Sequence, residues 1–222
     1  MTTVNGALTC LRALETPPLR IAILPRDSAG LHPQQASLAW IQALGGAAVL
    51  ASYAWGFISH AESVGALWGG VPASLRSLYT LNMLLATVGY FLFTPFLLLR
   101  LPPAETRIAG GFGYGVFAPL TALVLIASAL WMPLTFALLA RPSAWLWGLV
   151  RLDLALAGAG SLGLATAILF LRSPVRARGR ALALVGLVPF CLQTAVLDAL
   201  VWPAYFPAAA IAPASAGAGP QR

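Results

Sequence analysis

Three ionisable side chains lie inside long apolar stretches of this sequence, where a charged group costs roughly 2.5–3.5 kcal/mol unless it is paired or hydrated. Arg151 and Asp153 stand six and eight residues into one stretch, and Asp198 stands eight residues before the end of the last one. At 1.5 Å per helical residue, all three lie about 9–12 Å from the same end of the helices. The short side chain of Asp198 cannot reach a membrane surface from that depth. It must therefore pair, take up a proton or line a hydrated cavity.

The two helices that carry these residues are antiparallel neighbours across a short connection. This predicts an ion pair between Arg151 and Asp198, formed directly or through one water. Alternatively, Arg151 alone reaches the membrane surface with its long stem. Arg151 and Asp153 are two residues apart and do not share a helix face, so one of them should point elsewhere. Two carboxylates against one guanidinium leave a net negative charge, which suits a cation or a proton better than an anion.

Three further side chains complete the candidate binding set. Asn82, near the start of the second apolar stretch, fits an interhelical hydrogen bond as well as a ligand contact. Trp131 lies in the third stretch and Gln193 in the fifth. Most tryptophans fall toward the end that holds the charges, and three of them are typical of interfacial anchors: Trp145, Trp147 and Trp202.

The sequence offers little for catalysis, for a metal or for a cofactor. His32 and His60 have no second histidine at metal-ligand spacing, although Glu62 is close to His60. The chain has no G-x-S-x-G motif, and without lysine it cannot form a retinal-type Schiff base. We therefore expect no catalytic residue, no metal ligand and no cofactor, and we favour a non-enzymatic protein.

The composition requires lipid as the outer solvent. The 222-residue chain is 59% hydrophobic and 9% charged, with a mean hydropathy of +0.85, whereas a soluble domain carries about 25% charged residues. Five apolar runs are close to the roughly 20 residues that cross a bilayer as a helix. They predict an all-α integral membrane protein with a bundle of about five transmembrane helices. Within a domain of residues 37–207, the predicted helices are residues 38–59, 78–99, 113–140, 145–171 and 181–206.

The flanking segments predict an orientation. Residues 1–36 carry charges and prolines that interrupt every apolar stretch, which predicts a polar, poorly ordered leader rather than a signal peptide. Residues 208–222 are rich in Ala, Pro and Gly, which is typical of a disordered tail. Nine arginines flank the runs on one side and three on the other. The positive-inside rule then predicts a cytoplasmic N-terminus and an exterior C-terminus, in the plasma (inner) membrane.

The arginines sit between apolar runs, which suits anionic lipid headgroups and argues against nucleic-acid binding. We expect the lipid bilayer and a small-molecule or cation ligand as partners. The favoured function is binding or transport of a small molecule or ion through a polar pocket in the exterior half. The alternative is a structural or accessory subunit whose buried charges only stabilise helix packing. Five helices, small size and many tryptophans resemble the tryptophan-rich sensory/translocator proteins, a resemblance of architecture that carries over no functional residue.

Overall fold

The computed structural model describes residues 31–206, and these form helices with no β-strand among them. Five helices in this part of the chain are long and apolar enough to cross a membrane, which confirms the predicted all-α integral membrane fold. Three of them are regular: α1 (Pro33–Ser59), α3 (Phe117–Ala140) and α4 (Ala144–Leu169). The other two change register. The second spanning helix joins α2 (Ala73–Pro95) to the π-helical segment η2 (Phe96–Arg100), and the last joins α5 (Ala177–Cys191), π-helical η5 (Leu192–Val201) and α6 (Trp202–Tyr205).

The first helix begins earlier than the sequence predicts, at Pro33 rather than at residue 38. His32 caps it, because its side chain accepts a hydrogen bond from the Gln34 N–H, while the Gln35 side chain accepts one from the His32 N–H. Proline at the first helical position loses no hydrogen bond there. Most of the predicted leader, and the whole of the predicted tail, lies outside the described residues.

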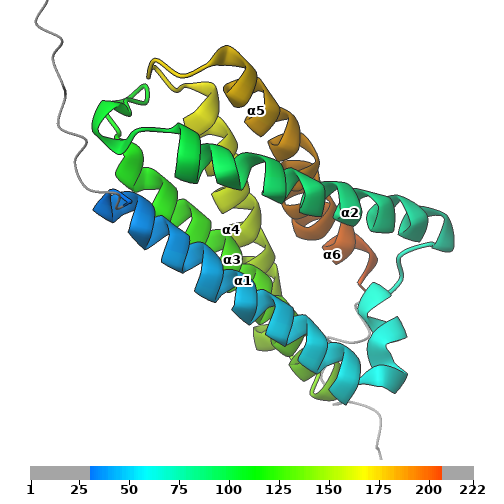
Figure 1. Ribbon diagram of the computed structural model, residues 1–222. Coiled ribbons are helices and arrows are strands. Elements are labelled where there is room, and N and C mark those ends of the chain that lie inside the picture. The colour runs from blue at the N-terminus through cyan, green and yellow to red at the C-terminus, as the bar shows by residue number, and fades with distance from the viewer. Residues whose placement is uncertain (1–30, 207–222) are drawn as a thin grey trace, which may run out of the picture. The chain divides into compact units, whose positions relative to one another are not determined.

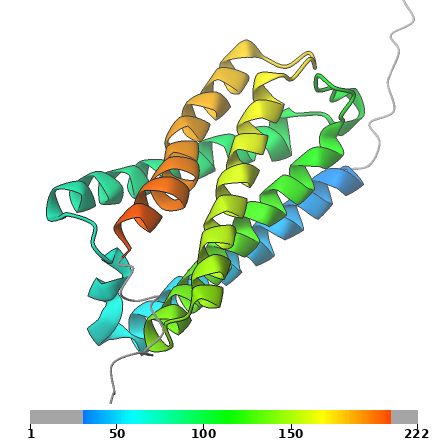
Figure 2. The ribbon, with the colours of Figure 1, turned by 180° about the vertical axis from the view of Figure 1, so that it is seen from behind.

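The spanning helices pack as a chain of neighbours. α3 lies between α1 and α4, and α4 also contacts α5 and η5 (Figures 1 and 2). α2 packs along α5. The C-terminal end of α2 meets α1, and there the hydroxyls of Tyr90 and Thr94 donate to Gln42 Oε1 at 2.7 and 3.0 Å. α2 is therefore positioned mainly by the last spanning helix.

Glycines set the closest approaches between these helices. A Cβ added at Gly89 of α2 would lie 2.1 Å from the Gly186 carbonyl oxygen of α5, so the two backbones touch directly. A Cβ added at Gly158 of α4 would lie 2.9 Å from Ala195 Cα of η5. Small residues allow such close packing where lipid gives no hydrophobic drive for helix association.

Both π-helical segments follow a proline. Pro95 and Pro189 have no N–H to donate to the preceding turn, which weakens the α-helical hydrogen-bond ladder at these points. η2 begins directly after Pro95, and η5 begins shortly after Pro189 and continues for 10 residues. A π-helical stretch is rare, and single π turns are frequent at functional sites.

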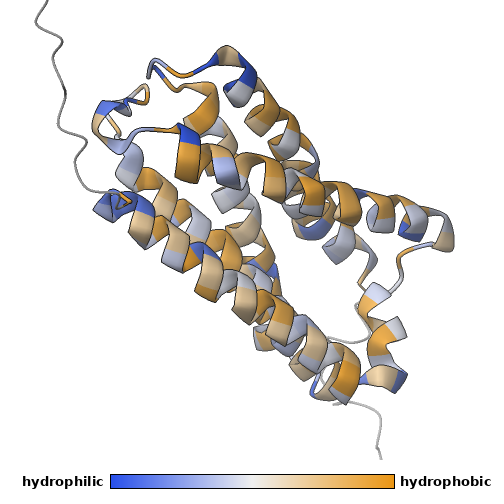
Figure 3. Ribbon diagram, in the orientation of Figure 1, coloured by the Kyte–Doolittle hydropathy of each residue, from blue (hydrophilic) through white to orange (hydrophobic). Residues whose placement is uncertain are grey.

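The two ends of the bundle differ. At the arginine-rich end, formed by the loops 101–113 and 170–176, backbone hydrogen bonds tie the loops together, including Arg172 N–H to the Arg107 carbonyl at 2.8 Å. The opposite, tryptophan-rich end consists of η1 (Ala61–Trp68), the loop 141–143 and α6. Polar residues gather toward helix ends while apolar ones cover the spans (Figure 3). Large exposed apolar side chains mark the outer faces: Leu44, Leu50, Leu84, Phe91, Ile126, Leu152, Leu162, Val185 and Leu200.

Candidate functional site

A chain of hydrogen bonds links α2 to the last spanning helix in the tryptophan-rich half. Asn82 Nδ2 donates to Gln193 Oε1 at 2.9 Å and to the Pro189 carbonyl at 3.1 Å. Gln193 Nε2 then donates to Asp198 Oδ1 at 2.8 Å. The structure therefore brings together three of the predicted site residues, Asn82, Gln193 and Asp198.

The π-helical register makes this chain possible. Gln193 and Asp198 are five residues apart, and on a regular α-helix two such side chains point about 140° away from each other. In a π-helix, hydrogen bonds run from residue i to residue i+5, and this places residues five apart one above the other. Since η5 covers both residues, its register aligns the amide with the carboxyl group.

Asp198 faces the interior of the bundle. Its carboxyl group lies within Coulombic range of two tyrosine hydroxyls, Tyr53 on α1 and Tyr79 on α2. The Tyr79 hydroxyl donates to the Leu197 carbonyl at 2.7 Å, and the Tyr53 ring lies 6.0 Å from the ring of Trp131. Asp198 is only partly buried. Trp131 is not a member of the hydrogen-bond chain that holds it. Asp198 thus has Gln193 as its hydrogen-bond partner and tyrosines of two other spanning helices in its vicinity.

The predicted direct ion pair between Arg151 and Asp198 is not formed. No ion pair with a nitrogen–oxygen distance within 4.0 Å joins any of the described residues. The Arg151 side chain is exposed, and its guanidinium group lies 6.0 Å from the centre of the Trp147 ring. Asp198 instead accepts a hydrogen bond from Gln193, and the groove that Arg151 lines does not include Asp198.

Asp153 separates from Arg151 as the spacing predicts. Its side chain is buried, with 6% of its surface exposed, whereas Arg151 lies on the outer face of α4. The Asp153 Oδ2 atom has no hydrogen-bond partner among the described residues. Asp153 therefore stands apart from the chain that holds Asp198, although both carboxyl groups lie in the same half of the bundle.

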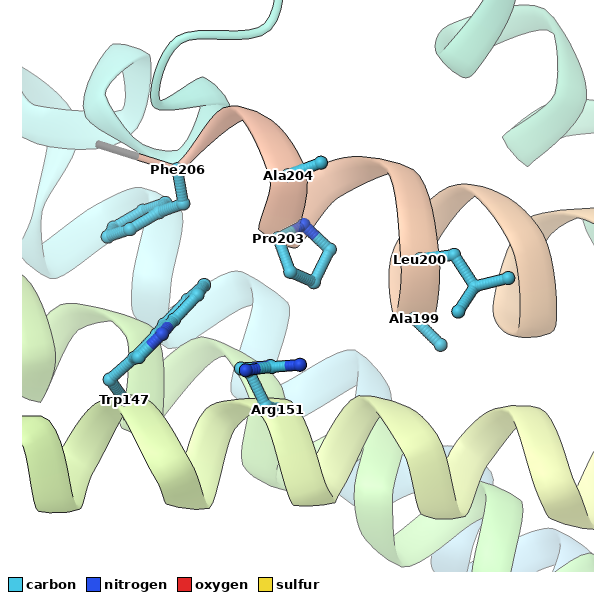
Figure 4. Close-up of a pocket in the computed structure, with 7 residues that line it drawn as sticks. All are labelled: Trp147, Arg151, Ala199, Leu200, Pro203, Ala204 and Phe206. Atoms are coloured by element: carbon cyan, nitrogen blue, oxygen red, sulfur yellow. The ribbon is translucent and has the colours of Figure 1, made fainter. Parts of the chain in front are cut away.

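A groove of about 380 Å³ lies between α4 and the last spanning helix (Figure 4). Arg151 points into it, and its lining does not include Asp198. At one end of the groove the rings of Trp147 and Phe206 stack at 5.3 Å. The residues that line it include Trp147 and Arg151 of α4 together with Ala199, Leu200, Pro203 and Phe206.

The tryptophans divide into interior and surface groups. Trp202 is buried, its Nε1 donates to the Leu67 carbonyl at 2.8 Å, and its ring lies 6.3 Å from that of Trp131. The prediction that Trp202 anchors the protein at the membrane surface is therefore wrong. Trp145 is 73% exposed, as an anchor requires, and Trp147 is half-buried beside the groove.

Sequence reasoning missed Tyr53 and Tyr79, the two tyrosines in the vicinity of Asp198. A tyrosine inside a membrane span brings a hydroxyl group that needs a partner, and this signal was present at Tyr53 and Tyr79. Sequence reasoning also missed a hydrogen bond between α4 and η5, in which Thr194 Oγ1 donates to Ser161 Oγ at 2.6 Å. Hydrogen bonds between helices depend on how each helix is rotated about its axis, and the local sequence does not determine that rotation.

Among residues 31–206, no three His, Cys, Asp or Glu side chains gather closely enough to hold a metal ion. Comparisons of the chain with protein-family models, with curated proteins and with solved structures find no match.

Proposed function

We propose that this multi-pass membrane protein binds a small monovalent cation or a proton at the carboxyl group of Asp198. The observation that carries the proposal is the placement of Asp198 in a π-helical segment, facing the bundle interior, with an amide rather than a cationic group as its partner. Ionisable residues inside membrane spans commonly mark ion pathways and proton relays. With the orientation that the flanking arginines predict, the site lies in the half of the bundle nearer the exterior.

The chemistry around Asp198 suits a positive ligand. Its hydrogen-bond partner is the neutral Gln193 amide, and the hydroxyls of Tyr53 on α1 and Tyr79 on α2 are close enough to feel its charge. Hard cations prefer carboxylate, carbonyl and hydroxyl oxygens. A proton satisfies the same carboxyl group without further ligands. An anion would meet uncompensated negative charge at this point.

Labelling with dicyclohexylcarbodiimide tests the proposal, because this reagent attacks protonated carboxyl groups in apolar surroundings. The protein is reconstituted in nanodiscs of phosphatidylcholine, and the labelled residue is located by peptide mass spectrometry. We expect label on Asp198, less of it as the pH rises, and less at fixed pH when Na⁺ or K⁺ binds there. Asp198→Asn removes this label while keeping an oxygen that can accept from Gln193. Asp153→Asn is the matched control and should retain it.

A specific observation also supports the second candidate, a structural or accessory subunit. The polar chain from Asn82 to Asp198 ties α2 to the last spanning helix, and the groove beside α4 does not reach it. In that case Asp198 exchanges no ligand. If the extent of labelling at Asp198 does not change with Na⁺, K⁺ or pH, the result would support the structural role and reject the cation site.

A further inference from the structure

The groove on the outer side of α4 is separate from the interior site at Asp198. α4 and η5 are in close contact at Gly158 and Ala195, and the groove lies between them further toward the tryptophan-rich end. It opens outward, since Leu152 on α4 and Leu200 on the last helix are 55% and 66% exposed. In a membrane, these flanking side chains face lipid, so the groove is accessible from the bilayer.

Arg151 provides the only charged group in the lining of this groove. None of the described carboxylates lies within 4.0 Å of its guanidinium group, and the nearby Asp153 points into the bundle. Arg151 stands about 10 Å along α4 from its first residue, Ala144, at 1.5 Å per residue. A long arginine stem spans much of that distance and carries the guanidinium group toward the headgroup region. The groove therefore pairs an unmatched positive charge with an apolar wall.

We propose that this groove binds one anionic phospholipid of the surrounding bilayer. The lipid phosphate accepts hydrogen bonds from the Arg151 guanidinium group, which matches phosphate with two parallel donors. One acyl chain lies over Ala199 and Leu200, beside the turn that contains Pro203 (Figure 4). The lining fits a lipid better than a water-soluble anion, because no second charged side chain is present and the groove opens on a lipid-facing surface.

Native mass spectrometry of the full chain, released from nanodiscs of mixed phosphatidylglycerol and phosphatidylcholine, tests this proposal. We expect one phosphatidylglycerol molecule to be retained in preference to phosphatidylcholine by about tenfold, the size of one good charge-assisted contact. Arg151→Gln should abolish the preference. The matched control is Arg141→Gln, because Arg141 is exposed at the same end of the bundle but lies outside the groove. That variant should keep the preference.

A second variant distinguishes lipid binding in the groove from a general attraction of anionic lipid to positive charge. Ala199→Leu fills the groove without changing any charge, and it should also reduce lipid retention while intrinsic tryptophan fluorescence shows a folded protein. Equal losses in Arg151→Gln and Arg141→Gln would overturn the proposal in favour of unspecific attraction. Preferential retention of added oleate, a fatty acid without a phosphate, over phosphatidylglycerol would overturn the assignment of a phospholipid. Carbodiimide labelling of Asp198 should be unchanged in Arg151→Gln, so the groove and the cation site can fail independently.

Discussion

The contact between Gly89 and Gly186 gives the sharpest test of the fold. Gly89→Ala would place a methyl group 2.1 Å from the Gly186 carbonyl oxygen, and the lower limit of ordinary contact is 3.4 Å. α2 and α5 would have to separate by about 1.3 Å at this crossing. Because the obstacle is backbone rather than a flexible side chain, no rotamer change relieves it.

The expected loss of stability in Gly89→Ala is the sum of two opposing effects. Overpacking in a well-packed contact costs about 1–3 kcal/mol, and a clash with backbone lies at the upper end of that range. Alanine is intrinsically better than glycine in a helix by about 1 kcal/mol, which offsets part of the loss. We expect Gly89→Ala to lower the free energy of unfolding by about 2 kcal/mol. Gly46→Ala is the matched control, because a Cβ there meets nothing within 4 Å, and it should be neutral or slightly stabilising.

Unfolding in bicelles by titration with sodium dodecyl sulfate, followed by tryptophan fluorescence, measures both variants against the parent. The difference between Gly89→Ala and Gly46→Ala isolates the helix contact, since both changes carry the same gain in helix propensity. Equal stability of the two variants would show that the α2 and α5 backbones do not touch at this crossing.

Two further predictions concern orientation and the interior. Reporter fusions after Arg180 and after Arg222 should give opposite signals, with the former cytoplasmic, because nine flanking arginines against three set the orientation; equal signals would refute the odd number of spans. Tyr79→Phe should cost about 1 kcal/mol in the same unfolding assay, because the hydrogen bond to the Leu197 carbonyl is lost. Tyr205→Phe, at a tyrosine that is 39% exposed, should cost less than half of that.

The number and placement of the spanning helices could be read from the sequence, since they depend on run length and hydropathy alone. The structure differs mainly at the helix ends, which extend beyond the apolar runs. α2 begins at Ala73, about five residues before the predicted start, and α5 begins at Ala177, inside the basic loop. Arginine stems tolerate that position because their charged groups can reach water.

Helix rotation could not be read from the sequence. The spacing of Ala155, Ala159 and Gly163 predicts a small-residue contact face on α4, yet Ala155 and Ala159 are exposed. Only Gly163 of the three lies against another helix, at Leu120 of α3, and the other close contacts of α4 use Gly158 against η5 and Gly160 against α3. Small residues cover nearly every face of this helix, so their spacing does not select one.

The same uncertainty of rotation explains the wrong ion pair. Depth along a helix follows from residue number, but the face follows from register, and the register of η5 is π-helical rather than α-helical. Polar composition did select Asn82, Gln193 and Asp198, which the structure joins in one chain. Polar composition could not exclude Arg151 from this set, because composition does not show which face of α4 carries its side chain.

The position of α2 and the state of Asp198 are coupled through a short path. Asn82 lies about two helical turns from the crossing at Gly89, and it binds both Gln193 and the Pro189 carbonyl next to the start of η5. A shift of α2 at Gly89 therefore moves the partner that orients Gln193, and Gln193 in turn holds Asp198. If Asp198 binds a cation or a proton, Gly89→Ala should change its carbodiimide labelling and lower the stability, whereas Gly46→Ala should leave the labelling unchanged and should not lower the stability. A stability loss without a change in labelling would mean that the polar chain adapts to the shift and that Asp198 is held by η5 alone.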